Sequence, residues 1–315
     1  MWLLDSLAMQ AVALGEGDPE EVLSRSIEHD RVHSSFLLTG SGDRPRAAAL
    51  AFARALVCEA QSGGTCERCA SCRKSVEAEE PIVLDGEGRR GPTLRHVGDH
   101  PDLLWIERGA DDTRIRIRQI RDLQLALRLG AHEGGRRGAV LMDAERVNVQ
   151  AQNALLRLLE EPPPRTSLVL VSTRISTILP TLRSRSVHLR FPIEPEPPLR
   201  DPEAPESIRE LVEILDGLRA MSVGRVLDVA ERYRGVRATA AESVGELIDV
   251  ASRWLVEDVK ARVARDERPD PRELDAHRSL QQLRRELFER NANPQMVAER
   301  LLLGLRDTVA LHVAR

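Results

Sequence analysis

The fold is decided by residues 137–191, which read RGAVLMDAERVNVQAQNALLRLLEEPPPRTSLVLVSTRISTILPTLRSRSVHLRF. Gly138 to Met142 is a short apolar run that ends at Asp143, which is typical of a buried parallel strand with a carboxylate at its carboxyl end. Between Ala151 and Leu159 the apolar residues recur at helical spacing, which predicts a helix with one apolar face. Three prolines beginning at Pro162 end that helix, because proline lacks the amide donor and clashes with the preceding turn.

Two further strands follow the predicted helix. One spans Ser167 to Val171, and a shorter one alternates through Val187 to Phe191. Earlier in the chain we expect a helix from Pro19 to His29, with Asp18 as its N-cap, and a strand from His33 to Thr39. A strand, a helix and a strand at this spacing form the unit of a parallel sheet with helices on its faces. The sequence therefore predicts an α/β fold.

Composition and charge narrow the class of protein. Aromatic residues make up only 3% of the chain, so the core must rely on Leu, Val, Ile and Ala, which favours helices and a parallel sheet. The net charge of −4 argues against a protein that grips nucleic acid over a wide surface. No run of about 18 apolar residues is present, and the apolar start MWLLDSLAMQAVAL lacks a basic segment and contains Asp5. We expect a packed N-terminal helix and a cytoplasmic protein that does not enter a membrane.

The four cysteines of the chain are Cys58, Cys66, Cys69 and Cys72. Three of them are spaced CxxCxxC, and such short gaps let thiolates converge on one tetrahedral ion, with the fourth supplied by the end of the preceding helix. Disulfides or scattered buried thiols are the alternatives, but disulfides are rare in cytoplasmic proteins. We predict a structural zinc site of four thiolates, which leaves no coordination position open for catalysis.

A family resemblance is carried by AQNALLRLLEEPP, residues 151–163, and by LRSRS, residues 182–186. Together they resemble the second half of the AAA+ domain in bacterial clamp-loader subunits of DNA polymerase III. In active members of that family the strand ends in an Asp-Glu pair that holds Mg²⁺ and activates water. The corresponding pair here is Asp143-Ala144, and Glu145 follows one residue late. The resemblance therefore implies an AAA+ fold without the general base.

The same resemblance gives Arg185 a role. The segment Ser184-Arg185-Ser186 stands where the family carries a Ser-Arg-Cys motif. In AAA+ rings the corresponding arginine reaches the γ-phosphate bound by the neighbouring subunit and stabilises charge that develops there. The alternative is a surface arginine in a loop that also contains Arg183 and Arg190. We predict that Arg185 is an arginine finger that acts in trans.

The glycine loop that would hold ATP is degenerate. Nucleotide-binding relatives place GxxGxGKT after the first strand, where amides cradle the phosphates, Lys neutralises them and Ser or Thr holds Mg²⁺. From Gly40 this chain reads GSGDRPRAAAL, in which Asp43 adds a negative charge and Pro45 removes an amide donor. Arg44 or Arg46 is an alternative to the lysine, but a forked guanidinium does not replace a point charge at a tight phosphate site. We predict that this chain binds no ATP.

Two other features bear on function. Arg114, Arg116 and Arg118 alternate with isoleucines and would share one face of an extended segment, either as a solvated face or as a contact with the phosphates of DNA. Gly224 stands where the lid of active relatives carries a nucleotide-sensing arginine, and Arg225 is one position off. A further sensor position falls on Ser172 or Thr173, where we expect only capping and packing.

The Pro-rich acidic segment EPEPPLRDPEAPE indicates a domain boundary. We predict an AAA+ domain at 1–193 with a zinc module at 58–72, a short helical lid at 194–235 and an all-α collar for oligomerisation at 236–315. The apolar face of the final helix, Met296 to Leu305, is compatible with a subunit interface and equally with core packing.

Three functions are compatible with parts of the chain. A working ATPase lacks its loop lysine, its catalytic glutamate and its sensor arginine, and a nucleic-acid-binding zinc module is weakened by the acidic balance and the few aromatics. An ATPase-inactive clamp-loader subunit explains a degraded nucleotide site beside an intact Ser-Arg-Ser corner. By the resemblance, such a subunit assembles with ATPase subunits and a clamp-opening subunit to load the sliding clamp on primed DNA during replication. The alternative is the ATPase subunit of the gamma/tau type.

Overall fold

Two units make up the chain, Met1–Glu194 and Pro195–Arg315, and each is described by itself. The computed structural model describes residues 17–78, 82–84, 94–109, 112–128, 130–133, 135–192, 198–288 and 290–310. The helix expected at the start of the chain lies outside these ranges. None of the helices within them has the length and the hydropathy that a membrane span requires.

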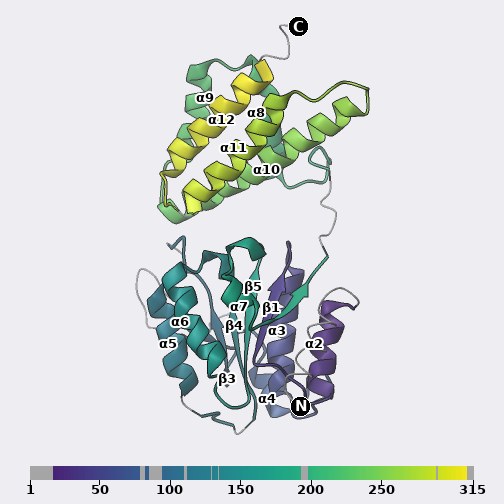
Figure 1. Cartoon of the computed structure of the whole chain (residues 1–315), viewed down its shortest axis with the longest axis vertical. Helices are drawn as coiled ribbons and strands as arrows, with labels where there is room; N and C mark the ends of the chain where they lie inside the picture. Colours follow the sequence, from purple (N-terminus) through teal and green to yellow (C-terminus); the bar gives the residue numbers. More distant parts are fainter. Residues whose placement is uncertain are drawn as a thin grey trace. The chain divides into compact units, whose positions relative to one another are not determined.

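The first unit is built on a six-stranded sheet in the order β2-β3-β4-β5-β1-β6 (Figure 1). Strands β3, β4, β5, β1 and β6 are parallel to one another, and β2 pairs antiparallel with β3 at the edge. The strands are β1 Ser35–Thr39, β2 Leu94–Val97, β3 His100–Ile106, β4 Arg137–Leu141, β5 Thr166–Ser172 and β6 Val187–Arg190. The predicted α/β fold with a parallel sheet is confirmed.

Helices cover both faces of this sheet because successive residues of each strand point to opposite sides. Leu37 and Leu104 enter the core under α5, α6 and α7, whereas Phe36 and Trp105 enter the core under α2 and α3. In Figure 1, α5 and α6 lie on one side of the strands and α3 and α2 on the other. The helices are α2 Pro19–Glu28, α3 Arg44–Val57, α4 Ala70–Lys74, α5 Ile117–Arg128, α6 Val149–Glu160 and α7 Pro180–Arg183.

The ends of α2 and α6 follow from local sequence. Asp18 Oδ1 accepts a hydrogen bond from the amide of Glu20 at 3.4 Å, with Pro19 in the first helical position. Asn148 Oδ1 accepts from the amide of Ala151 at 2.8 Å and so begins α6. That helix ends immediately before the three prolines, as predicted.

The predicted extended segment of alternating arginines is wrong. α5 begins at Ile117, so Arg118 lies on a helix and does not share an extended face with Arg114 and Arg116. Arg116 pairs with Asp112 at 2.6 Å, and Arg118 with Asp122 at 3.7 Å, each four residues away in the sequence. Helical periodicity outweighs the short alternation because it buries a longer apolar row, consisting of Ile120, Leu123 and Leu127.

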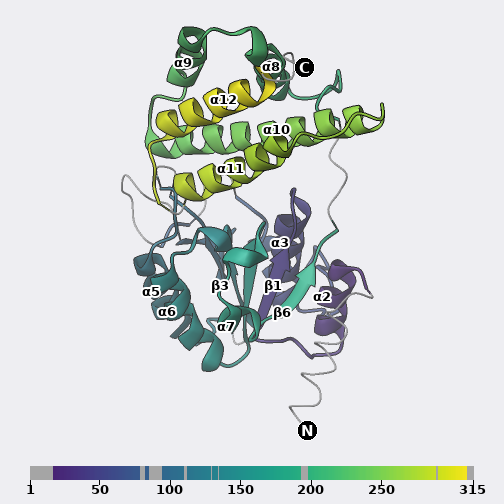
Figure 2. The same ribbon diagram turned by 45° about the horizontal axis from the view of Figure 1, so that its top comes forward.

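The second unit is helical in its described part, with α10, α11 and α12 lying side by side (Figure 2). Its helices are α8 Glu206–Gly217, α9 Val223–Glu231, α10 Arg237–Val263, α11 Pro271–Phe288 and α12 Pro294–Ala310. One apolar core joins all five. α10 and α11 approach closely where a Cβ added at Gly245 would lie 2.8 Å from the Phe288 ring. The division between a lid and a collar after residue 235 stays a prediction.

The apolar face of α12 belongs mainly to the core of its own unit. Val297, Leu301, Leu302 and Leu305 are buried there, whereas Met296 is 60% exposed. Core packing therefore accounts for most of this face.

Candidate functional site

The glycine loop leaves the carboxyl end of β1 and is packed tightly against the end of β6. The amide of Gly40 donates to the carbonyl of Ser172 at 3.3 Å, and a Cβ added at Gly40 would lie 2.8 Å from the Cβ of Phe191. Asp43 is the N-cap of α3, and Pro45 lies in the first turn of that helix. A phosphate at this helix start would meet a carboxylate and one amide donor fewer than usual.

Both arginines that were alternatives to the missing lysine have partners elsewhere. Arg44 Nη2 lies 3.3 Å from Glu20 Oε1 on α2. The guanidinium of Arg46 lies 4.8 Å from the centre of the Trp105 ring and 3.9 Å from Glu77 Oε1. Each arginine would have to leave these partners in order to neutralise a phosphate in the loop.

Asp143, beyond the end of β4, is paired with an arginine. Its backbone is left-handed, with φ of 50°, and its Oδ2 accepts a hydrogen bond from Arg108 Nε at 3.0 Å. Arg108 Nη1 also donates to the carbonyl of Asp112 at 3.1 Å. Ile106 lies opposite Leu141 in the parallel pair of β3 and β4, so residues just past the two strands meet. A cation is thus already paired with the carboxylate to which the family resemblance assigns Mg²⁺ binding.

Glu145 is also engaged within the chain. Its carboxylate accepts the hydroxyl of Thr173 at 2.7 Å and the amide of Thr173 at 3.3 Å, which ties the short 3₁₀ turn Ala144–Arg146 to the end of β5. Ala144, where the family resemblance leads one to expect a glutamate, is buried. Glu145 therefore holds together the segments that follow β4 and β5.

The turn that carries Arg185 is anchored to the start of β1. Leu182 is buried, and Ser186 Oγ donates to its carbonyl at 3.0 Å. The same hydroxyl lies 2.8 Å from Ser35 Oγ, the first residue of β1. These contacts fix the backbone on either side of Arg185.

The Arg185 side chain lies on the surface, with 39% of it exposed. Its Nη2 lies 3.0 Å from Glu160 Oε1 at the end of α6, and its Nη1 donates to the carbonyl of Thr181 at 3.2 Å. The guanidinium therefore has two partners within its own unit.

The glycine loop lies at the carboxyl ends of the strands, and the Arg185 turn lies at their amino ends. β6 runs parallel to β1, with Phe36 opposite Val187 and Thr39 opposite Arg190. The turn before Val187 thus lies beside the start of β1, whereas Gly40 follows its end. At about 3.3 Å per residue, the start of β1 at Ser35 and the loop at Gly40 are roughly 16 Å apart. Arg185 cannot reach the glycine loop of its own chain across that distance.

The four cysteines converge between the end of α3 and the short helix α4. All four Sγ atoms lie within 4.8 Å of one another, and those of Cys66 and Cys72 are 4.0 Å apart. Four thiolates around a tetrahedral zinc ion would be about 3.8 Å apart, since Zn–S bonds are about 2.3 Å long. Cys58 and Cys72 are buried. The four thiols fit a single metal ion.

The surroundings act in opposite directions on two of the thiols. Hydrogen bonds from the amides of Arg68 and Cys69 lower the pKa of the Cys66 thiol to about 6. Burial raises the pKa of Cys72 to about 12. A metal ion would offset that burial, because a coordinating thiol is deprotonated outright.

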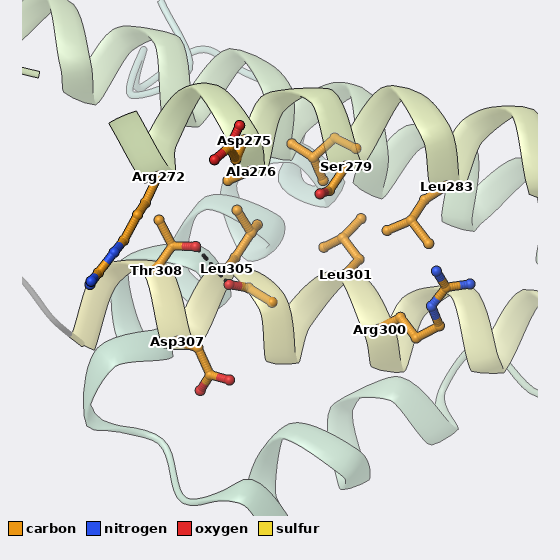
Figure 3. Close-up of a pocket in the computed structure, with 12 residues that line it drawn as sticks. Arg272, Asp275, Ala276, Ser279, Leu283, Arg300, Leu301, Leu305, Asp307 and Thr308 are labelled. Carbon is orange, nitrogen blue, oxygen red and sulfur yellow. Dashed lines mark hydrogen bonds between the residues drawn. The ribbon is translucent and has the colours of Figure 1, made fainter. Parts of the chain in front are cut away.

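The second unit contributes a surface groove and the predicted sensor position. The groove between α11 and α12 has a volume of about 280 Å³, and its floor includes Leu283, Leu301 and Leu305 (Figure 3). In Figure 3, Asp307 points away from this floor. Gly224 lies in the first turn of α9 and offers no side chain for sensing a nucleotide. The groove has the apolar floor of a packing seam and no converging polar groups among the residues drawn.

Comparisons with known proteins agree with this architecture. The family model described as DNA polymerase III, delta subunit, matches residues 16–195. DNA polymerase III subunit delta' of Pseudomonas aeruginosa is 32% identical over 212 residues, which are 67% of this chain and 58% of that protein. The subunit delta' of Bacillus subtilis is 29% identical over 178 residues, 56% of this chain and 47% of that protein. A gamma/tau subunit from Mycobacterium tuberculosis is 26% identical over 195 residues, 60% of this chain and 30% of that protein.

The parallel sheet with helices on both faces and a glycine loop after β1 is the AAA+ fold of clamp-loader subunits. The chain belongs to the DNA polymerase III delta-subunit family, and the relatives of about 30% identity are delta' subunits. The family resemblance predicted from residues 151–163 and 182–186 is confirmed. The chain spans about half the length of the curated delta' relatives it matches.

Proposed function

We propose that this chain is a delta'-type subunit of a DNA polymerase III clamp loader. The chain itself binds no ATP, and its Arg185 contacts the ATP bound by a neighbouring ATPase subunit. In this role it assembles with the ATPase subunits and a clamp-opening subunit. Through the complex it acts on the sliding clamp and on primed DNA. The observation that carries the proposal is that Arg185 and the glycine loop, which lacks its lysine, lie at opposite ends of the strands.

Internal contacts support the proposed loss of ATP binding. Asp143 is neutralised by Arg108, so a divalent ion there would compete with a cation already 3.0 Å away. Arg44 and Arg46 are held by carboxylates and by an aromatic ring outside the loop. Binding Mg-ATP would require breaking several of these contacts without a lysine to compensate.

The position of Arg185 supports a role in trans. An arginine finger stabilises charge on the phosphoryl group during its transfer, and it can be supplied by a neighbouring subunit. Hydrogen bonds of Ser186 hold the turn that carries Arg185, and among the described residues only surface contacts with Glu160 and Thr181 oppose a change of the Arg185 rotamer. A subunit with no nucleotide of its own thus still contributes to one ATP site.

The four thiols support a structural zinc ion. Cys58, Cys66, Cys69 and Cys72 offer four sulfur donors, the set that tetrahedral structural zinc takes. The ion would tie the end of α3 to α4 and would stabilise the thiolate of the buried Cys72. It would take no part in ATP chemistry, because all four positions are filled by the protein.

We expect the purified, reduced chain to contain about one zinc ion, measured by elemental analysis. Cys69→Ser removes one thiolate and should lower the zinc content and loosen the segment 58–72. Arg68→Ala, at the exposed neighbouring position, keeps all four thiols and should leave the zinc content unchanged. Freshly prepared protein without zinc would contradict the assignment.

The isolated chain should show no tight, Mg²⁺-dependent binding of ATP in calorimetry and no hydrolysis of it. The physical reason is the missing lysine, whose charge has no replacement in the loop. The ATPase subunits of the complex serve as the positive control. Micromolar binding to this chain would instead favour an ATPase subunit of the gamma/tau type.

Arg185→Ala should leave folding and assembly intact and lower the clamp- and DNA-stimulated ATPase of the reconstituted complex. A finger contributes on the order of a thousandfold at its own site, so activity at the facing site should be lost and that of the other sites should remain. Arg183→Ala, two residues earlier on α7, is the matched control and should have much less effect. Equal ATPase activity of the Arg185→Ala and wild-type complexes would refute the finger.

A further inference from the structure

The Arg185 side chain is held back by one carboxylate. Glu160 is the last residue of α6, and its Oε1 lies 3.0 Å from Arg185 Nη2. A negative charge at the C-terminal end of a helix is unfavourable, and a cation beside it relieves the repulsion. The ion pair with Arg185 therefore also offsets the unfavourable position of the Glu160 carboxylate at the end of α6.

This ion pair favours one rotamer of Arg185 and is weak enough to be broken. Glu160 is 51% exposed and Arg185 39% exposed, so water screens their attraction. The contact with the carbonyl of Thr181 engages the other terminal nitrogen. A phosphate oxygen pair offers the same fork two charge-assisted hydrogen bonds and more negative charge than one carboxylate does.

We propose that Glu160 is a latch, a positioning residue that keeps Arg185 folded against its own subunit until a phosphate on the neighbouring subunit displaces it. The inference rests on the proposed role of Arg185 in trans. Because the backbone at residues 182–186 is fixed, the exchange needs only a rotation of the Arg185 side chain. Such rotations of exposed side chains take picoseconds to nanoseconds, so the latch sets an equilibrium and does not limit the rate.

The size of the effect follows from the weakness of the pair. A ligand that needs a minor conformer binds more weakly by the fraction of that conformer. For an exposed ion pair this amounts to about two- to fivefold. Removing the latch should therefore make the finger more available, and kcat/KM for ATP at the facing site should rise.

The test compares Glu160→Gln with wild type in the full reconstituted complex, with kcat/KM for ATP as the measured quantity. Glutamine keeps the shape and removes the charge, so kcat/KM at the facing site should rise about two- to fivefold. Glu161→Gln changes the same charge at the next exposed residue and should have no such effect. Thermal unfolding of Glu160→Gln should match that of wild type, because the position is exposed.

The same substitution in an Arg185→Ala background separates the possible failures. With the finger gone, Glu160→Gln should change nothing. A fall in kcat/KM in both backgrounds, or no change in either, would overturn the latch while leaving the finger intact, provided that Arg185→Ala alone lowers activity. If Arg185→Ala alone has no effect, the proposed function fails and the latch fails with it.

Discussion

The parallel register of β1 and β6 is the constraint on which the rest of this unit depends. It places the glycine loop at the carboxyl ends of the strands and the turn of Arg185 at their amino ends, because Phe36 pairs with Val187 and Thr39 with Arg190. A hydrogen bond between the hydroxyls of Ser35 and Ser186 joins the turn of Arg185 to the start of β1. A chain built in this way cannot bring Arg185 to its own nucleotide loop. If the arginine serves a phosphate, that phosphate must belong to another subunit.

At the carboxyl ends of the strands, the polar side chains are already paired within the chain. Arg108 satisfies Asp143, Thr173 satisfies Glu145, and Arg44 turns to Glu20 on α2. Each contact supplies from within the chain what a metal ion, a water molecule or a phosphate supplies in an active relative. The loss of ATP binding that we propose is thus a matter of several occupied partners as well as one missing lysine. At the amino ends of the strands, in contrast, Arg185 lies on the surface and pairs with the exposed carboxylate of Glu160.

Local patterns in the sequence were sufficient for the class of fold but not for strands β2 and β3 or for these contacts. The apolar run before Asp143, the cap at Asn148 and the three prolines predict β4 and α6, and the spacing of the cysteines predicts their convergence. The pairs Arg108–Asp143 and Glu160–Arg185 join segments far apart in the chain, and no local pattern encodes them. The alternation at Arg114–Arg118 misled because helix α5 begins inside it, at Ile117, and buries a longer apolar row farther along. Likewise, Asp102 gave no signal that it would be buried and accept the amides of His132 and Glu133.

The most direct test of the account is the structure of the reconstituted complex with a γ-phosphate analogue bound to the ATPase subunits. We expect that the guanidinium of Arg185 has left Glu160 and contacts the analogue on the neighbouring subunit. We also expect that the loop from Gly40 to Asp43 holds no nucleotide and that Arg108 still pairs with Asp143. A nucleotide in this chain's own loop, or an Arg185 remote from every phosphate in the complex, would contradict it.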